Sequence, residues 1–303
     1  MCCYPMGSEH SAWSAARPRT TGPGTSVHVV NRRADCPTSS SARPRPLSPW
    51  ESSVGERRSA AMAEHKRPTI QVISAHSGDF VWRAGGALAL YAERGCDARI
   101  TCLSYGERGE SQGLWKQAGM TLETAKSKRR AEAEAAAEAL GAHITFLDLG
   151  DYPLRVDDAG LDRIVAEIRD AQPEILLTHV ASDPYNRDHN AAHEATLLAR
   201  QVSQAAGHDR STPPIGAPQV IQFEPHQPEQ CGFVPNLLLD ITPVFDRKRK
   251  AMECMSAQSH LVEYYTDLGL RRGVQAVRNG GGESITQAEA YQRVFPVVGK
   301  VLL

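Results

Sequence analysis

The sequence has no apolar run as long as a membrane-spanning helix and no excess of charge of either sign. Its 34 Lys and Arg residues balance 35 Asp and Glu residues, so the net charge of −1 offers no general basic surface for nucleic acid. None of the 7 cysteines has the CxxC spacing of a thiolate zinc site, and their scatter suits reduced thiols better than a disulfide framework. We therefore expect a cytoplasmic protein whose partners include neither a membrane nor a nucleic acid.

Residues 1–61 lack both Lys and apolar periodicity, and they are rich in Ser, Pro and Arg. Such a stretch cannot bury enough apolar surface to offset the entropy lost on ordering, so we expect a disordered N-terminal extension. It lacks the apolar core of a secretory signal, although Arg- and Ser-rich starts also occur in organelle transit peptides. Residues 62–303 are long enough for one well-buried α/β domain.

Short apolar runs alternate with helical patterns along this second part of the chain. The alternation predicts parallel strands joined by right-handed crossovers, and hence an α/β fold, a Rossmann-like three-layer sandwich with a mostly parallel central sheet. The expected strands cover residues 69–76, 98–105, 144–149, 174–179, 219–224 and 237–241. The expected helices cover residues 81–94, 122–140, 161–170, 190–205 and 248–259.

His76 and Asp79 follow the first expected strand, and open α/β sheets bind their ligands at the carboxyl ends of strands. His189 opens a helical pattern after a later strand and could complete a His, Asp and His shell around one divalent ion. Each segment also has a plainer interpretation, Asp79 as a helix cap and His189 with His193 as a pair on one helical face. Their convergence on one edge of the sheet favours a metal site, with Zn²⁺, Fe²⁺ and Mn²⁺ all as candidates.

Several motifs together resemble the LmbE/PIG-L family of zinc-dependent N-acetylglucosaminyl deacetylase-like proteins over most of residues 69–303. These motifs are Ala75-His76-x-x-Asp79, Gly85-Gly86, Gly106-Glu107, Arg129-x-x-Glu132, Asp188-His189, Asp240-Ile241-Thr242 and Ser256-Ala257-Gln258. The resemblance implies that the catalytic domain spans residues 62–303. It also implies that His76, Asp79 and His189 hold a zinc ion.

Two positions depart from the deacetylase pattern of this family. Gly78 stands where the resemblance implies an aspartate as general base, and a glycine cannot accept a proton. Asn186 stands where the family usually has a histidine that steadies the oxyanion and protonates the leaving amine. Loss of one proton-transfer group typically slows a reaction by ~10²–10⁴-fold, so amide hydrolysis is disfavoured.

Long runs resemble one branch of the family, the LmbE-type hydratases of 4-oxalomesaconate in gallate and protocatechuate catabolism. The runs cover residues 75–86, 104–111, 148–155 and 224–229. These enzymes add water to an unsaturated oxo-tricarboxylate to give 4-carboxy-4-hydroxy-2-oxoadipate, so the resemblance implies this small molecule as substrate. We expect Arg83, near a helix N-terminus, and Arg108, near another strand end, to bind its carboxylates. The alternative for Arg83 is a solvated surface ion pair.

The proton-handling carboxylate is expected in the loop after the second strand, with Glu110 as the first candidate and Glu107 as the second. Either residue could instead order that loop. Asp188 is expected to orient His189 or a water bound beside it, or else to cap the helix that follows.

Asn186 and His226 are further candidates for substrate contact, although the loop around His226 also suits plain turn chemistry. Two other classes of function remain open. One is a deacetylase that has relocated its base, and the other is a non-catalytic metal-binding protein. The sequence leaves the oligomeric state open, a homo-oligomer included.

Overall fold

The computed structural model describes residues 67–298, and the extension expected over residues 1–61 lies outside them. The core of the described part is a seven-stranded sheet with the order β3-β2-β1-β4-β5-β7-β6. The strands are β1 (Thr69–Ser74), β2 (Asp97–Cys102), β3 (His143–Phe146), β4 (Ile175–Thr178), β5 (Gln219–Phe223), β6 (Leu237–Asp240) and β7 (Ala288–Arg293).

Strands β1 to β5 run parallel to one another, whereas β7 pairs antiparallel with both β5 and β6. The expected α/β fold with a mostly parallel sheet is therefore confirmed. Parallel pairing brings the loops that follow β1, β2 and β4 to one edge of the sheet, and this edge is where ligands bind in such folds.

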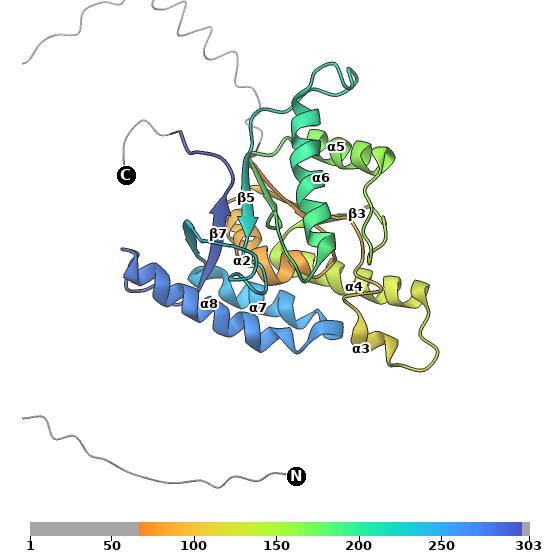
Figure 1. Cartoon of the computed structure of the whole chain (residues 1–303). Helices are drawn as coiled ribbons and strands as arrows, with labels where there is room; N and C mark the ends of the chain where they lie inside the picture. Colours follow the sequence, from red (N-terminus) through yellow and green to blue (C-terminus); the bar gives the residue numbers. More distant parts are fainter. Residues whose placement is uncertain (1–66, 299–303) are drawn as a thin grey trace, which may run out of the picture. The chain divides into compact units, whose positions relative to one another are not determined.

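Helices cover both faces of the sheet, which gives the expected three layers (Figure 1). The helices are α2 (Asp79–Glu93), α3 (Gln112–Trp115), α4 (Leu122–Leu140), α5 (Asp158–Ala171), α6 (Arg187–Gln204), α7 (Phe245–Glu253) and α8 (Leu261–Arg278), with short 3₁₀ turns η1 (Thr242–Val244) and η2 (Ser256–Gln258). Among residues 67–298, no helix combines the length and the hydropathy that a membrane span needs.

Side chains of β1 alternate between two apolar cores because successive residues of a strand point to opposite faces. Ile70 and Val72 belong to the core under α2, α4, α7 and α8, whereas Ile73 belongs to the core under α5 and α6. All six residues of β1 are buried. The strand that leads into His76 is thus held from both sides.

The helix expected over residues 122–140 has those bounds in the structure as α4. Thr121 caps its first turn by accepting a hydrogen bond from the N–H of Thr124. Gly141 ends it in the left-handed region with φ of 74°, a conformation that glycine adopts without steric cost.

The C-terminal part differs from the sequence expectation, which had one helix over residues 248–259 and no later strand. The structure has α7, η2, the long α8 and then β7. Two glycines inside α8 weaken its helical pattern. Gly273 is required there because a Cβ would lie 2.3 Å from the carbonyl oxygen of Thr286. The segment of β7 has a helix-like composition and forms a strand because β5 and β6 offer it partners on both sides.

Candidate metal centre and active site

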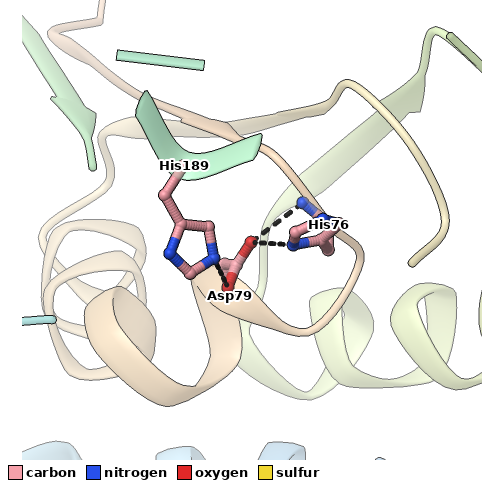
Figure 2. A group of neighbouring side chains, drawn as sticks. All are labelled: His76, Asp79 and His189. Carbon is pink, nitrogen blue, oxygen red and sulfur yellow. Dashed lines mark hydrogen bonds and ion pairs between the residues drawn. The ribbon is translucent and has the colours of Figure 1, made fainter. Parts of the chain in front are cut away.

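Three buried side chains meet at the carboxyl edge of the sheet. His76 lies in the loop after β1, Asp79 is the first residue of α2, and His189 lies in the first turn of α6. They are 1%, 5% and 3% exposed. Figure 2 shows the two imidazoles pointing toward the carboxylate from opposite sides. The structure therefore brings together the three residues that the sequence predicts as metal ligands.

The donor atoms of this triad fit a single metal ion. One ligand atom from each residue can be chosen so that all three lie within 4.8 Å of one another. Nδ1 of His76 is 3.2 Å and Nε2 of His189 is 3.5 Å from an oxygen of Asp79. Both ring nitrogens are buried without a hydrogen-bond partner. A divalent ion between them would give each lone pair a partner, and two imidazoles with a carboxylate are a common donor set for zinc.

Each imidazole of the triad is held at its other nitrogen by a carboxylate. His76 Nε2 lies 3.2 Å from Oδ2 of Asp188, and His189 Nδ1 lies 2.8 Å from Oδ2 of Asp183. Such outer carboxylates orient metal-binding histidines and raise their basicity. The structure places Asp188 against His76, whereas the sequence had placed it beside His189. Asp183, which lies before Pro184 in the loop that leads into α6, was not predicted from the sequence.

The protonation of these groups follows from the same contacts. Burial acts to lower the pKa of His76, but the hydrogen bond to Asp188 and the negative charge of Asp79 outweigh burial and raise that pKa to about 10. Burial acts to raise the pKa of Asp183, but the hydrogen bond from His189 outweighs it and lowers that pKa to about 2. The surrounding carboxylates therefore favour positive charge at His76, while Asp183 and Asp188 are favoured in their ionised forms.

His179 is a third imidazole at this site and was not among the residues predicted from the sequence. Its Nε2 accepts a hydrogen bond from the N–H of Ala75 and lies 3.4 Å from Asp79, and its ring stacks on that of His189 at 4.2 Å. Burial and the neighbouring His189 hold the pKa of His179 well below its usual range. The neutral ring of His179 already accepts a hydrogen bond, and it therefore stabilises the triad by packing against it. Its position directly after β4 was the available signal.

Asn186 caps α6, since its side-chain oxygen accepts a hydrogen bond from the N–H of Asp188. Its amide group donates to Oε1 of Glu110 at 2.9 Å. Asp188, the expected alternative cap, instead accepts hydrogen bonds from the N–H groups of Tyr152 and Leu154. Asn186 thus connects the start of α6 to a carboxylate on another loop.

A pocket of about 380 Å³ opens in front of the triad, and Glu110 lies on its wall. Glu110 Oε1 is 4.0 Å from Nδ1 of His76 and accepts hydrogen bonds from Asn186 and from the hydroxyl of Tyr152. Its Oε2 accepts a hydrogen bond from Nε2 of Gln258. The first candidate for the proton-handling carboxylate therefore faces the same space as the triad.

Glu107, the second candidate, is fully buried outside the pocket wall. It accepts a hydrogen bond from the N–H of Tyr105 and lies 3.4 Å from the guanidinium of Arg108. Burial raises the pKa of Glu107. The Arg108 side chain is half-exposed, also outside the pocket wall, and donates to the carbonyl oxygen of Asp151. This pair orders the loop after β2.

Arg83 and His226, both predicted to contact the substrate, lie on the pocket wall. Arg83 is a buried cation whose Nη2 is 3.8 Å from Asp79 and whose guanidinium sits over the ring of Phe223. Burial acts to lower the pKa of His226, and so does the nearby Arg83 cation. The alternative of a solvated Arg83 is wrong, because the residue is only 9% exposed.

Comparison with known proteins places this site in a family. A model of the family described as GlcNAc-PI de-N-acetylase, PIG-L, matches residues 71–200. The 4-oxalmesaconate hydratase of Pseudomonas putida is 52% identical over 230 residues, which are 75% of this chain and 89% of that protein. A probable N-acetyl-α-D-glucosaminyl L-malate deacetylase of Bacillus cereus is 27% identical over 63% of this chain and 83% of that protein.

Comparison with solved structures gives a consistent result. The crystal structure of GalB from Pseudomonas putida KT2440, described as a 4-carboxy-2-hydroxymuconate hydratase, has a TM-score of 0.77 at 51% identity and covers 78% of this chain and 100% of its own. The N,N′-diacetylchitobiose deacetylase of Pyrococcus horikoshii, at 17% identity and a TM-score of 0.62 over 82% of this chain and 94% of its own, shares the fold. The chain belongs to the PIG-L family.

Proposed function

We propose that this protein is a hydratase that adds water to the C=C bond of 4-oxalomesaconate and gives 4-carboxy-4-hydroxy-2-oxoadipate. The observation that carries the proposal is the 52% identity to the Pseudomonas putida hydratase over 89% of that protein's length. The names of that relative and of the GalB structure describe keto and enol forms of one tricarboxylate skeleton. The reaction would belong to the breakdown of aromatic acids, in the cytoplasm.

The site is suited to a zinc ion held by His76, Asp79 and His189, whose donor atoms converge and whose two inward-facing imidazole nitrogens have no other hydrogen-bond partner. Bound there, zinc would supply Lewis-acid polarisation of the carbonyl and carboxylate oxygens of the substrate. Asp188 and Asp183 would keep the two imidazoles in the required orientation through their other nitrogens.

Glu110 would take the proton from water as the water oxygen bonds to the alkene carbon. Three side-chain donors, from Asn186, Tyr152 and Gln258, hold its two oxygens in place, because a carboxylate accepts hydrogen bonds at both oxygens. The same group can return the proton to the adjacent carbon, so that H and OH are added and nothing is released. A general base must reach its proton, and Glu110 faces the pocket while Glu107 does not.

Arg83 would bind a carboxylate of the substrate. Among the described residues that line the pocket, it is the one Arg or Lys side chain. Its guanidinium is buried and held beside Asp79, so it presents a fixed positive charge at the pocket wall. A buried guanidinium pairs well with a planar carboxylate. A neutral amino sugar offers no such partner.

The deacetylase alternative lacks its proton-transfer groups at this site. Position 78 is a glycine, and Asn186 has neither the basicity nor the acidity of a histidine. The family relationship to deacetylases therefore accounts for the fold and the metal ligands. The hydratase proposal accounts for the residues at positions 78 and 186.

The test is to give the zinc-loaded protein 4-oxalomesaconate and, separately, an N-acetylglucosaminide. We expect loss of the conjugated absorbance of the first compound and no acetate release from the second. The same protein stripped with a chelator is the control. Acetate release without hydration would support the deacetylase instead, and metal binding without turnover of either compound would support a non-catalytic role.

A further inference from the structure

We propose that Gln258 is a positioning residue that fills the space beside Gly78 and aims the carboxylate of Glu110 at the pocket. Gln258 lies in η2, at the end of the turn that connects α7 to α8, and is 7% exposed. The proposal rests on the proposed function, since it assumes that Glu110 is the base. It adds a residue whose side chain acts on the base and not on the substrate.

Gly78 leaves room for the Gln258 side chain and is not needed for backbone conformation. Its φ of −96° and ψ of −24° are accessible to any residue. A Cβ at this position would lie 2.6 Å from Oε1 of Gln258, and real Cβ atoms essentially never approach another atom so closely. The two groups therefore compete for one space, and a side chain at position 78 would require the Gln258 amide to move.

Arg129 sets the orientation of that amide. Its Nη2 donates to Oε1 of Gln258 at 2.8 Å, and its Nη1 donates to Glu132 at 2.7 Å. An arginine has donors only, so the oxygen of the Gln258 amide must face it. The NH₂ group of the same amide then faces Glu110, with Nε2 3.0 Å from Oε2. Because Arg129 is fully buried and paired, a flip of the amide would leave its Nη2 opposite another donor.

Glu132 completes the anchor from the far side. Its Oε1 accepts a hydrogen bond from the backbone N–H of Ala257, the residue before Gln258. The segment carrying Gln258 is thus tied to α4 through both its backbone and its side chain.

The result is that both oxygens of Glu110 are fixed. Oε2 is held by Gln258, while Oε1 is held by Asn186 and Tyr152 from two other loops. Among the described side chains, Gln258 is the donor to Oε2. Without this hydrogen bond, the carboxylate of Glu110 could rotate about Oε1. A displacement of about 1 Å can cost ~10²-fold in rate, so this contact should be visible in kcat.

The test is a double-mutant cycle with Gln258→Met and Glu110→Gln. Met has a similar length but neither donates to Glu110 nor accepts from Arg129. We expect Gln258→Met to lower kcat by at least about 10-fold with KM within about 2-fold, and to have no further effect in the Glu110→Gln background. An equal loss in both backgrounds, or no loss in either, overturns the proposal.

Gln258→Glu separates positioning from a purely structural role. It keeps an acceptor for Arg129 but places a second carboxylate against Glu110. A role confined to anchoring Arg129 predicts wild-type activity for this variant, and positioning predicts a loss of kcat at least as large as that of Gln258→Met. Gln227→Glu is the matched control, because it adds the same charge to the pocket wall with no described contact to Glu110. Its kcat loss should be clearly the smaller of the two.

A readout that needs no substrate keeps the two proposals distinct. In a crystal structure of Gln258→Met, the Glu110 carboxylate should adopt a new or split orientation while the metal ligands stay in place. An unchanged Glu110 overturns the positioning role even if the enzyme is a hydratase. Conversely, wild-type protein that leaves 4-oxalomesaconate unchanged overturns the proposed function, whatever the crystal shows for Glu110.

Discussion

Oδ2 of Asp188 lies 3.2 Å from Nε2 of His76, across 112 residues of sequence. The same carboxylate accepts hydrogen bonds from the N–H groups of Tyr152 and Leu154. One buried side chain of α6 therefore joins the loops that follow β1 and β3. Burial acts to raise the pKa of Asp188, but the hydrogen bonds from His76 and the two N–H groups outweigh burial and lower that pKa.

Replacing Asp188 by Asn should weaken metal binding. The amide keeps an acceptor for one N–H group but loses the charge that supports His76, and loss of such an outer carboxylate typically costs ~10–100-fold in metal affinity. Competition with a chromophoric chelator measures this affinity. Asp158→Asn, on the exposed start of α5, is the matched control. Equal affinity in the two variants would contradict the assignment.

The two histidines of α6 should differ sharply. His189 points its free Nε2 at Asp79, whereas His193, one turn later, uses Nδ1 to donate to the carbonyl oxygen of His179. We expect His189→Ala to abolish stoichiometric metal binding and His193→Ala to retain it. Metal content by elemental analysis of the purified variants decides this. Loss of metal in both variants would show that His193 also contributes to the centre.

Glu110→Gln should lower the hydration rate by ~10²–10⁴-fold and leave metal content unchanged, because an amide cannot accept the proton of water. Glu107→Gln is the informative partner variant. Glu107 is buried beside Tyr105 and Arg108 and does not line the pocket, so its replacement should cost less than about 10-fold in kcat. Initial rates with saturating substrate provide the comparison, and the reverse order would make Glu107 the base.

Arg83→Met and Arg108→Met form another matched pair. Arg83 lines the pocket as a buried cation, so its loss should raise KM for the tricarboxylate by about 10-fold or more, as expected for a charge-assisted hydrogen bond worth ~1.5–3 kcal/mol. Arg108 is half-exposed and bonds its own loop, so KM should change by less than about 2-fold. A larger KM effect from Arg108 would mean that the substrate reaches beyond the pocket wall.

Much of this site could be predicted because its signals are local. An apolar strand followed by His76 and Asp79, and a helix start at His189, identify the ligands once the strands are taken as parallel, since parallel strands share a carboxyl edge. The early strands are recognisable from short, partly apolar runs, and β1 is buried along its whole length.

The parts that escaped prediction depend on contacts between distant segments. Gln258 has no local pattern that marks it, and its role requires Arg129 and Glu110 to meet it from two other elements. Likewise β7 is a strand only because β5 and β6 lie on either side of it. Its Glu289 would be costly to bury without the partners that the fold brings to it.

Replacing Lys248, the counter-ion of Glu289, tests how β7 stabilises α2, the helix that carries Asp79. Glu289 of β7 accepts hydrogen bonds from the N–H groups of Gly86 and Ala87 within α2, and its Oε1 is 2.7 Å from Nζ of Lys248. Lys248→Met would leave this carboxylate buried without its counter-ion, which typically costs about 3–5 kcal/mol.

Urea unfolding of Lys248→Met should therefore show a free energy of unfolding lower by about that amount. Lys250→Met, on the exposed face of the same helix, should change it by less than about 0.5 kcal/mol. Adding Glu289→Gln to Lys248→Met should restore part of the loss, because the uncompensated charge is then gone while the amide oxygen still accepts from α2. If the double variant is no more stable than Lys248→Met, the cost lies in lost packing of the lysine stem and not in the buried charge.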